Sequence, residues 1–511
     1  MSIFKRFISI ENSIFALFIV AVLYGALKSP YSILAVYSEN PWVLLEFLLS
    51  FVLFIIIIYL NKRKISLLIQ PYWMFIKKHD LFFLSSSLLV LFMLQVGLLI
   101  KITTPIGWDV FDIFHSITTE NKEYSKIVLS LNPNNTFFFF MMYFINKFLH
   151  FIDVTGSWSN TWLSWQIVNC LFIDISLFLF YQAAKRVFNK VVASIAYSLF
   201  FLSLGLSPWL LVPYTDTAVL LFISLILFTY SIFDHVKSSI GKAILLLIIG
   251  MELASCFLMK PSSIVFFLAF LCIKTLKLML VEHNKQALKI IIVISLFLCI
   301  GVSYTVKSFR YFVNKQTITE IDKQQAKPWT LFVMMGLTGT GGYNDVDTKA
   351  VNQLPTQEEK KAYTIKIIQE RLKDKGFFGY LHFLAKKNIH NTANGDFDWG
   401  WDGGKLTAET PARTPIQKRL QNLYYPQNPK SKSIRIYMHS FYLLTLLGLL
   451  FSVPLKDREN KITILKLAFI GAILYLLFFE GGRSRYLIQF MPFWYLLSSN
   501  GWLRLWNYAK K

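Results

Sequence analysis

The chain has 511 residues, of which 55% are hydrophobic, 17% are aromatic and only 16% are charged. Soluble globular proteins carry roughly 25% charged residues, so this composition excludes a soluble enzyme, a disordered scaffold and a secreted disulfide protein. The 52 Lys and Arg residues outnumber the 29 Asp and Glu residues. Membrane proteins retain such an excess on the cytoplasmic side near anionic lipids, and we therefore expect no nucleic-acid partner. The composition predicts an all-α polytopic membrane protein embedded in the lipid bilayer.

Twelve apolar segments are long enough to cross a hydrocarbon layer, which takes about 20 residues. No small-residue cleavage site follows the first segment, so we expect it to be a retained span rather than a signal peptide. The predicted spans are residues 12–29, 42–60, 80–101, 157–183, 190–207, 217–234, 242–258, 262–279, 288–307, 436–454, 462–479 and 486–505.

Short basic loops predict the orientation of these spans, because Lys and Arg are retained in the cytoplasm. A path that alternates across the cell membrane with both termini in the cytoplasm places every such loop inside. The loops are residues 5–6, 61–64, 77–78, 185–186, 235–241, 274–289, 456–461 and 510–511.

Two large outer regions follow from this topology, a first loop at 102–156 and a second at 308–435. Within the first loop we interpret 136–150 as an amphipathic helix at the outer interface with its aromatic side in the lipid. Within the second, a Thr cap and an acidic first turn predict a helix from Thr356 to about Lys375. The expected domains are a two-span extension at 1–79, a transmembrane module at 80–307, the extracytoplasmic region at 308–435 and a three-span module at 436–511.

The first outer loop carries two acids, Asp109 and Asp112, after Trp108 and before Asn134 and Asn135. A carboxylate beside an aromatic ring at the membrane boundary could act as a general base toward an acceptor hydroxyl. The two amides are candidates for hydrogen bonds to a sugar or acceptor. The alternative is that the acid caps a helix at an interfacial turn.

Tyr214 and Asp216 lie at the outer start of the span 217–234. Both are candidates for binding the sugar or the acceptor. Asp216 is also well placed to cap the helix and to complement its dipole. The two interpretations stay open at this point.

Basic residues mark two further outer turns. Lys260 precedes Pro261, and this lysine either binds an anion or snorkels before a proline that starts a helix. Arg483 and Arg485 precede the last span, against the tendency of basic residues to stay inside. The planar guanidinium suits phosphate oxygens. The two arginines are therefore candidates for binding a lipid phosphate at the outer boundary, while both interpretations of Lys260 stay open.

The segment 394–404 alternates acids and aromatics, among them Trp399 and Trp401. Three interpretations stay open: a structured loop, a platform on which an acceptor sugar stacks, and a divalent-cation site at Asp396, Asp398 and Asp402. The spacing lacks the further acids and the closing Glu of an EF-hand, so we expect no metal and no other cofactor. The glycine-rich run 339–342 follows no strand-to-helix unit and does not predict a nucleotide site.

The order of the outer motifs resembles the GT-C superfamily of polytopic glycosyltransferases. The motifs are Trp-Asp, Pro-Asn-Asn, Tyr-Thr-Asp-Thr, Lys-Pro and Arg-Ser-Arg-Tyr-Leu followed by Pro492, with a further stretch from Met334 to Asn344. They look most like the bacterial, Firmicute-type relatives of the dolichyl-phosphate-mannose protein mannosyltransferases. The likeness covers roughly residues 80–310 and 430–500.

This resemblance implies a polyprenyl-phosphate sugar as donor and a cell-wall polymer, teichoic acid or glycoprotein outside the cell as acceptor. It implies Asp109 as the catalytic base or the group that orients the acceptor, with Asp112 as second choice. It also implies Arg485, Arg483 and Lys260 as ligands of the lipid phosphate. The chain departs from better-known members because it lacks an adjacent Asp-Glu pair in the first loop and has two extra N-terminal spans.

Two other functions stay open on the sequence. A membrane-embedded polysaccharide polymerase or ligase also carries arginines and a large loop outside. A transporter of lipid-linked saccharides would keep charges at mid-membrane depth and show inverted repeats. The spans hold few acids, mainly Glu46, Asp174 and Glu252, and no repeat is evident.

Overall fold

The computed structural model describes residues 2–32, 78–233, 235–282, 285–399, 410–456 and 460–509. Within these ranges the chain forms helices and turns and no β-strand, which confirms the prediction of an all-α polytopic membrane protein. The α-helices are α1 (Ser2–Leu27), α5 (Asp80–Ile102), α6 (Trp108–Thr118), α7 (Lys122–Leu131), α8 (Thr136–Ile152), α9 (Trp162–Val187), α10 (Lys190–Leu204), α11 (Thr215–Phe233), α12 (Ser239–Met259), α13 (Val265–Lys277), α14 (Lys285–Lys315), α15 (Trp329–Met335), α16 (Asp345–Asn352), α17 (Gln357–Thr392), α18 (Pro415–Tyr424), α19 (Ser431–Ser452), α20 (Lys461–Phe478) and α21 (Met491–Ala509).

Short helical turns connect several of these helices. They are the 3-10 helices η1 (Pro133–Asn135), η2 (Pro208–Leu211), η3 (Pro261–Ile264) and η6 (Ser484–Phe490), and the π-helical turn η4 (Leu278–Glu282).

Nine helical segments of the described chain are long and apolar enough to cross a membrane. They include α1, α5, α9, α11, α12, α14, α19 and α20, together with the continuous stretch Pro261–Val281. Two more predicted spans coincide with α10, which has 15 residues, and with α21, which has 19 residues. The predicted span 42–60 lies outside the described residues, so the number of twelve spans stays a prediction.

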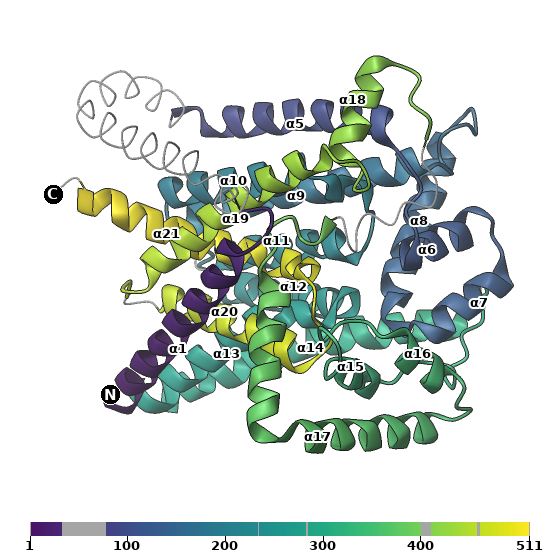
Figure 1. Cartoon of the computed structure of the whole chain (residues 1–511). Helices are drawn as coiled ribbons and strands as arrows, with labels where there is room; N and C mark the ends of the chain where they lie inside the picture. Colours follow the sequence, from purple (N-terminus) through teal and green to yellow (C-terminus); the bar gives the residue numbers. More distant parts are fainter. Residues whose placement is uncertain are drawn as a thin grey trace.

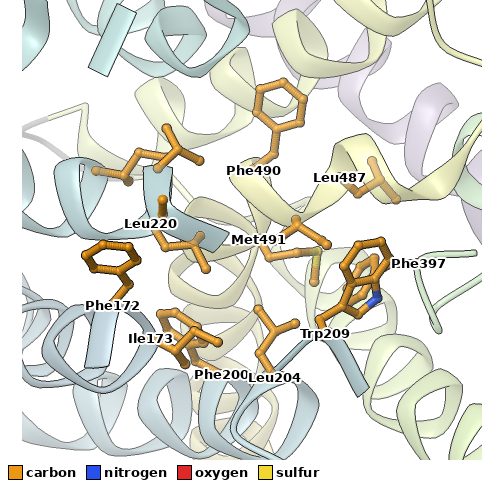
Figure 2. Packing of buried hydrophobic residues seen from close by; sticks show 14 of the residues in the cluster. Phe172, Ile173, Phe200, Leu204, Trp209, Leu220, Phe397, Leu487, Phe490 and Met491 are labelled. Atoms are coloured by element: carbon orange, nitrogen blue, oxygen red, sulfur yellow. The ribbon is translucent and has the colours of Figure 1, made fainter. Parts of the chain in front are cut away.

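Helix α9 lies in the interior of the bundle. It is apolar on nearly all sides and packs against α5, α10 and α11. A helix that is apolar all round is one that the fold buries. Figure 2 shows side chains from four elements pointing into this interior: Phe172 and Ile173 of α9, Phe200 and Leu204 of α10, Leu220 of α11, and Leu487 and Phe490 of η6.

Helix α14 has few buried residues and is attached to the bundle through α12. Gly250 of α12 faces Gly301 of α14 at their closest approach. A Cβ atom at Gly250 would lie 2.5 Å from the carbonyl oxygen of Leu298, and a Cβ atom at Gly301 would lie 2.3 Å from that of Leu247. Only glycine fits there, because small residues let membrane helices bring their backbones together.

The helix ends fall into two sets on opposite sides of the bundle. On one side Asp80, at the start of α5, pairs with Lys185 at the end of α9 and with Lys190 at the start of α10. Figure 1 shows both termini on this side, with α6, α7, α8 and α16 on the other. The arrangement agrees with spans that alternate in direction. Which side faces the cytoplasm stays a prediction.

Helix α17 confirms and extends the helix predicted at 356–375. Thr356 caps its start by accepting a hydrogen bond from the backbone N–H of Glu359. The helix does not end near Lys375, because Gly376 adopts a left-handed backbone (φ 59°) that turns the chain and lets a second leg continue to Thr392. Figure 1 shows the two legs meeting at this bend. The second leg contacts α1, α20 and η6.

Helix α8 covers the segment predicted to be amphipathic and interfacial. The prediction that its aromatic side faces lipid is only partly right. Phe138, Phe139 and Phe140 are buried, and Phe140 packs edge-to-face on Phe312 of α14. Only the second half of the helix exposes its aromatic side chains, with Phe151 being 83% exposed. The first half therefore packs against protein.

Candidate functional site

Asp109 lies in the first turn of α6 and is held by two residues from other elements. The side-chain amide of Asn135 donates to Oδ2 of Asp109 over 3.1 Å. The hydroxyl of Tyr214 lies 2.9 Å from the same oxygen and 2.8 Å from Oδ1 of Asn135, and its one proton is shared between these two acceptors. Burial raises the pKa of Tyr214, so its hydroxyl stays protonated and able to donate. Oδ1 of Asp109 makes no hydrogen bond within the described residues. One carboxylate oxygen is thus fixed and the other is left for a ligand.

Trp108 adopts a left-handed backbone (φ 54°), which large side chains rarely do. Its ring packs edge-to-face on Tyr214, with centroids 5.0 Å apart, and the guanidinium carbon of Arg485 lies 4.5 Å from its centroid. The indole N–H is buried and makes no hydrogen bond among the described residues. Strain of this kind persists where the surroundings impose it, often at functional sites.

Asp216 forms ion pairs with two of the predicted phosphate ligands, Lys260 and Arg485. Its Oδ1 accepts a hydrogen bond from the ammonium of Lys260, and its Oδ2 lies 3.6 Å from Nε of Arg485. The three side chains come from α11, from the turn after α12 and from η6. Asp216 lies in the first turn of α11, but its carboxylate faces these cations. Its position in the first turn agrees with the expected role at the helix dipole, and the ion pairs with Lys260 and Arg485 are an additional role.

Tyr486 completes the cationic side of the site. The ammonium of Lys260 lies 5.2 Å from its ring centroid and the guanidinium carbon of Arg485 lies 5.1 Å from it. Its hydroxyl donates to Glu480 over 2.9 Å. Cations over an aromatic face are stabilised by the ring quadrupole. The ring thus keeps both cations in place.

Asp112, the second candidate base, is engaged elsewhere. Its Oδ1 accepts a hydrogen bond from the hydroxyl of Tyr124 over 2.5 Å. Burial raises the pKa of Asp112, and the nearby charge of Asp109 raises it further. Each acid thus has one carboxylate oxygen engaged, but only that of Asp109 is held together with Asn135 and Tyr214, beside the ring that Arg485 contacts.

Lys327 belongs to the site and was not predicted. Its backbone N–H donates to the carbonyl of Leu131, and its ammonium donates to Oδ1 of Asn132 over 2.7 Å. Burial lowers the pKa of Lys327, while the charges of Asp109, Glu480 and Asp112 act in the opposite direction. The sequence did contain a signal, because Lys327 precedes a proline in the same way as Lys260.

The remaining candidates lie at the edge of the site or away from it. Asn134 is exposed, and its side-chain amide donates to Oδ1 of Asn135 over 3.4 Å. Arg483 precedes η6 and lies beside Gly342 of the segment between α15 and α16. Trp401 and Asp402 lie outside the described residues.

Trp399 does not form a surface for stacking on a sugar. It is fully buried against Trp209, and its indole N–H donates to the carbonyl of Tyr424 over 2.8 Å. The prediction that Trp399 binds an acceptor is wrong for this reason. In the part of the chain that the structure describes, no three His, Cys, Asp or Glu residues are placed to hold a metal ion.

A family model described as conserved hypothetical integral membrane protein matches residues 3–504 of the chain. Comparison with curated proteins and with solved structures gives no match. The family description names a place in the membrane and no reaction. Any activity has to be inferred from the site.

Proposed function

The chain belongs to this family of integral membrane proteins, and from its site we propose that it is a glycosyltransferase. It moves a sugar from a polyprenyl-phosphate carrier, such as undecaprenyl phosphate, to an extracytoplasmic acceptor. The acceptor is a cell-wall polymer, a teichoic acid or a glycoprotein. The enzyme lies in the cell membrane with both termini in the cytoplasm and its site on the outer face.

One observation carries the proposal. A carboxylate with an uncommitted oxygen, Asp109, and two cations, Lys260 and Arg485, meet where several apolar helices end. Charged groups at such a boundary are expensive unless they bind something. A lipid-linked anion presents its tail to the helices and its phosphate to the cations. The arrangement therefore suits a polyprenyl-phosphate donor.

The reaction is a single displacement at the anomeric carbon of the sugar. The acceptor oxygen forms the new glycosidic bond, its proton passes to Oδ1 of Asp109, and the bond between the anomeric carbon and the phosphate oxygen breaks. The electron pair of that bond leaves with the polyprenyl phosphate. Hydrogen bonds from Asn135 and Tyr214 hold the other oxygen of Asp109, so the base cannot rotate away.

Lys260 and Arg485 stabilise the phosphate as it departs, because both are held in place before the reaction starts. Asp216 lies between them and keeps two like charges together in a buried place. The buried N–H of Trp108 offers a further donor beside Arg485. Lys327 adds a third cation that interacts electrostatically with Asp109.

Sugar release from radiolabelled polyprenyl-phosphate monosaccharides tests the proposal directly. We expect the wild-type protein in nanodiscs to turn over one donor of a panel. The variant Asp109→Asn should lower that turnover by about 10²–10⁴-fold, the usual contribution of a general base. Asp374→Asn serves as the matched control, because Asp374 is an exposed acid of α17.

Three results would contradict the proposal or part of it. Full turnover by Asp109→Asn would remove the role of Asp109 as base. Consumption of lipid-linked oligosaccharides, with no monosaccharide donor used, would favour the polymerase or ligase. Movement of intact carrier across the bilayer without sugar release would favour transport.

A further inference from the structure

The turn at residues 394–399 is buried, although it is rich in polar residues. Asp396 is 1% exposed, Asp398 is 9% exposed, and Phe397 is fully buried. Phe397 and Asp398 both adopt left-handed backbone conformations, with φ values of 56° and 54°. Two consecutive non-glycine residues in this region are strained. The surrounding structure has to impose this shape.

Three separate elements hold the turn. Ser29, just after α1, donates to Oδ1 of Asn394 over 2.8 Å. The backbone N–H of Gly395 donates to Nδ1 of His439 in α19 over 3.0 Å, and the indole of Trp209 in η2 donates to the carbonyl of Asp396 over 3.1 Å. Figure 2 shows Phe397 beside Trp209, close to Leu487 and Met491. The turn is thus tied to the helix bundle on several sides.

The turn is also bonded to η6, which carries Arg485. Oδ2 of Asp398 accepts a hydrogen bond from the backbone N–H of Ser484 over 2.5 Å, and Oδ1 accepts one from the amide of Asn394 over 2.7 Å. Arg483, the residue at the cap position of η6, makes no capping bond with its own side chain. Asp398, which lies 86 residues earlier in the chain, therefore accepts the hydrogen bond that caps the start of η6.

We propose that the turn at 394–399 positions the phosphate-binding arginine, with Asp398 as the residue that does so. Its carboxylate fixes the backbone of Ser484, directly before Arg485, while Asp216 and Trp108 fix the guanidinium. The inference rests on the proposed function only in taking the ligand of Arg485 to be a lipid phosphate. Asp398 is a positioning residue, because it acts through Ser484 and touches no substrate.

The test compares Asp398→Ala and Asp398→Asn with the control Asp374→Ala, which changes an exposed acid of α17. Three quantities are measured in nanodiscs: amide hydrogen exchange of residues 484–490, affinity for undecaprenyl phosphate, and sugar release. We expect Asp398→Ala to speed exchange at Ser484, to weaken binding by about tenfold and to lower turnover on the order of 10²-fold. Asp398→Asn should restore part of each, because its one amide oxygen still accepts from Ser484, whereas its NH2 group cannot accept from the amide of Asn394.

A double variant separates positioning from a general loss of structure. Asp398→Ala combined with Arg485→Ala should bind undecaprenyl phosphate no more weakly than Arg485→Ala alone, because both changes remove the same interaction. Additive losses would overturn the proposal, as would unchanged exchange and binding in Asp398→Ala. If the wild type released no sugar, the proposed function would fail, while exchange and phosphate binding would still decide the role of Asp398.

Discussion

The two ends of the helix bundle each carry one aspartate between two cations. On the side of the termini, Asp80 is 16% exposed and its partners Lys185 and Lys190 are 31% and 30% exposed. On the opposite side, Asp216 is 1% exposed, with Lys260 at 13% and Arg485 at 8%. Both clusters consist of two cations and one carboxylate, but the side chains of the Asp216 cluster are much less exposed to solvent.

The difference in solvent exposure indicates that the two clusters have different roles. A partly hydrated ion pair loses little solvation and joins helix ends at a low free-energy cost. A buried pair loses far more solvation than its mutual attraction restores unless further bonds compensate. The Asp216 cluster holds two cations against one carboxylate in a buried place, and two aromatic rings face the guanidinium of Arg485. We infer that the Asp80 cluster anchors helices and that the Asp216 cluster awaits an anion.

The largest expected effect is on stability, from removal of the central carboxylate. Asp216→Asn leaves two buried cations without their counter-charge and should lower the free energy of unfolding by about 3–5 kcal/mol. Asp80→Asn should lower it by at most about 1 kcal/mol, because its cluster is accessible. Reversible unfolding in mixed detergent micelles measures both. Equal losses would contradict the distinction between the two clusters.

The next effect concerns activity and separates the clusters by function. Arg485→Ala should lower sugar release by on the order of 10²–10³-fold, since a preorganised partner of the developing phosphate charge is lost. Lys185→Ala should leave release unchanged. Arg485→Lys should fall between wild type and Arg485→Ala, because an ammonium keeps the charge but not the planar fork. A loss of activity in Lys185→Ala as large as that in Arg485→Ala would refute the assignment of roles.

The smallest effect comes from another buried cation, outside the Asp216 cluster. Lys387 of α17 donates to the carbonyls of Gly336 and Phe479, over 2.7 and 2.6 Å, and burial lowers its pKa to about 7. Between that value and the ordinary pKa near 10.5, the unfolded chain holds a proton that the folded chain does not. Stability should therefore rise with pH, by about 2 kcal/mol from pH 7 to 8.5.

Unfolding measured at several pH values tests this dependence. Lys387→Met should remove the rise of the unfolding free energy with pH, because no titrating group then remains at that position. An equally steep rise in the variant would assign the pH dependence to another group.

Much of the site was predictable residue by residue. Asp109, Lys260 and Arg485 stand out because charged groups at the ends of apolar segments are unusual. The helices were predictable as well, since length and apolar composition are local properties of a segment. The bend of α17 was missed, because a single glycine at position 376 does not reveal whether the chain stops or turns there.

Other features depended on contacts that no local pattern encodes. Lys327 reaches the site because the backbone after α14 runs back along α7. Trp399 resembles an exposed sugar-binding aromatic in sequence, yet the fold buries it against Trp209. Asp396 and Asp398 resemble metal ligands, but Asp398 caps a helix that begins 86 residues later.

The sequence by itself determined the class of protein, the approximate spans and the residues able to carry charge at the membrane boundary, because hydrophobicity and residue chemistry act locally. Only the tertiary structure decided which of those residues meet. Tyr214 and Asp109 are 105 residues apart, and Asp216 and Arg485 are farther apart still. Such pairs form because buried polar groups need partners, and the packing of the helices selects the partners available.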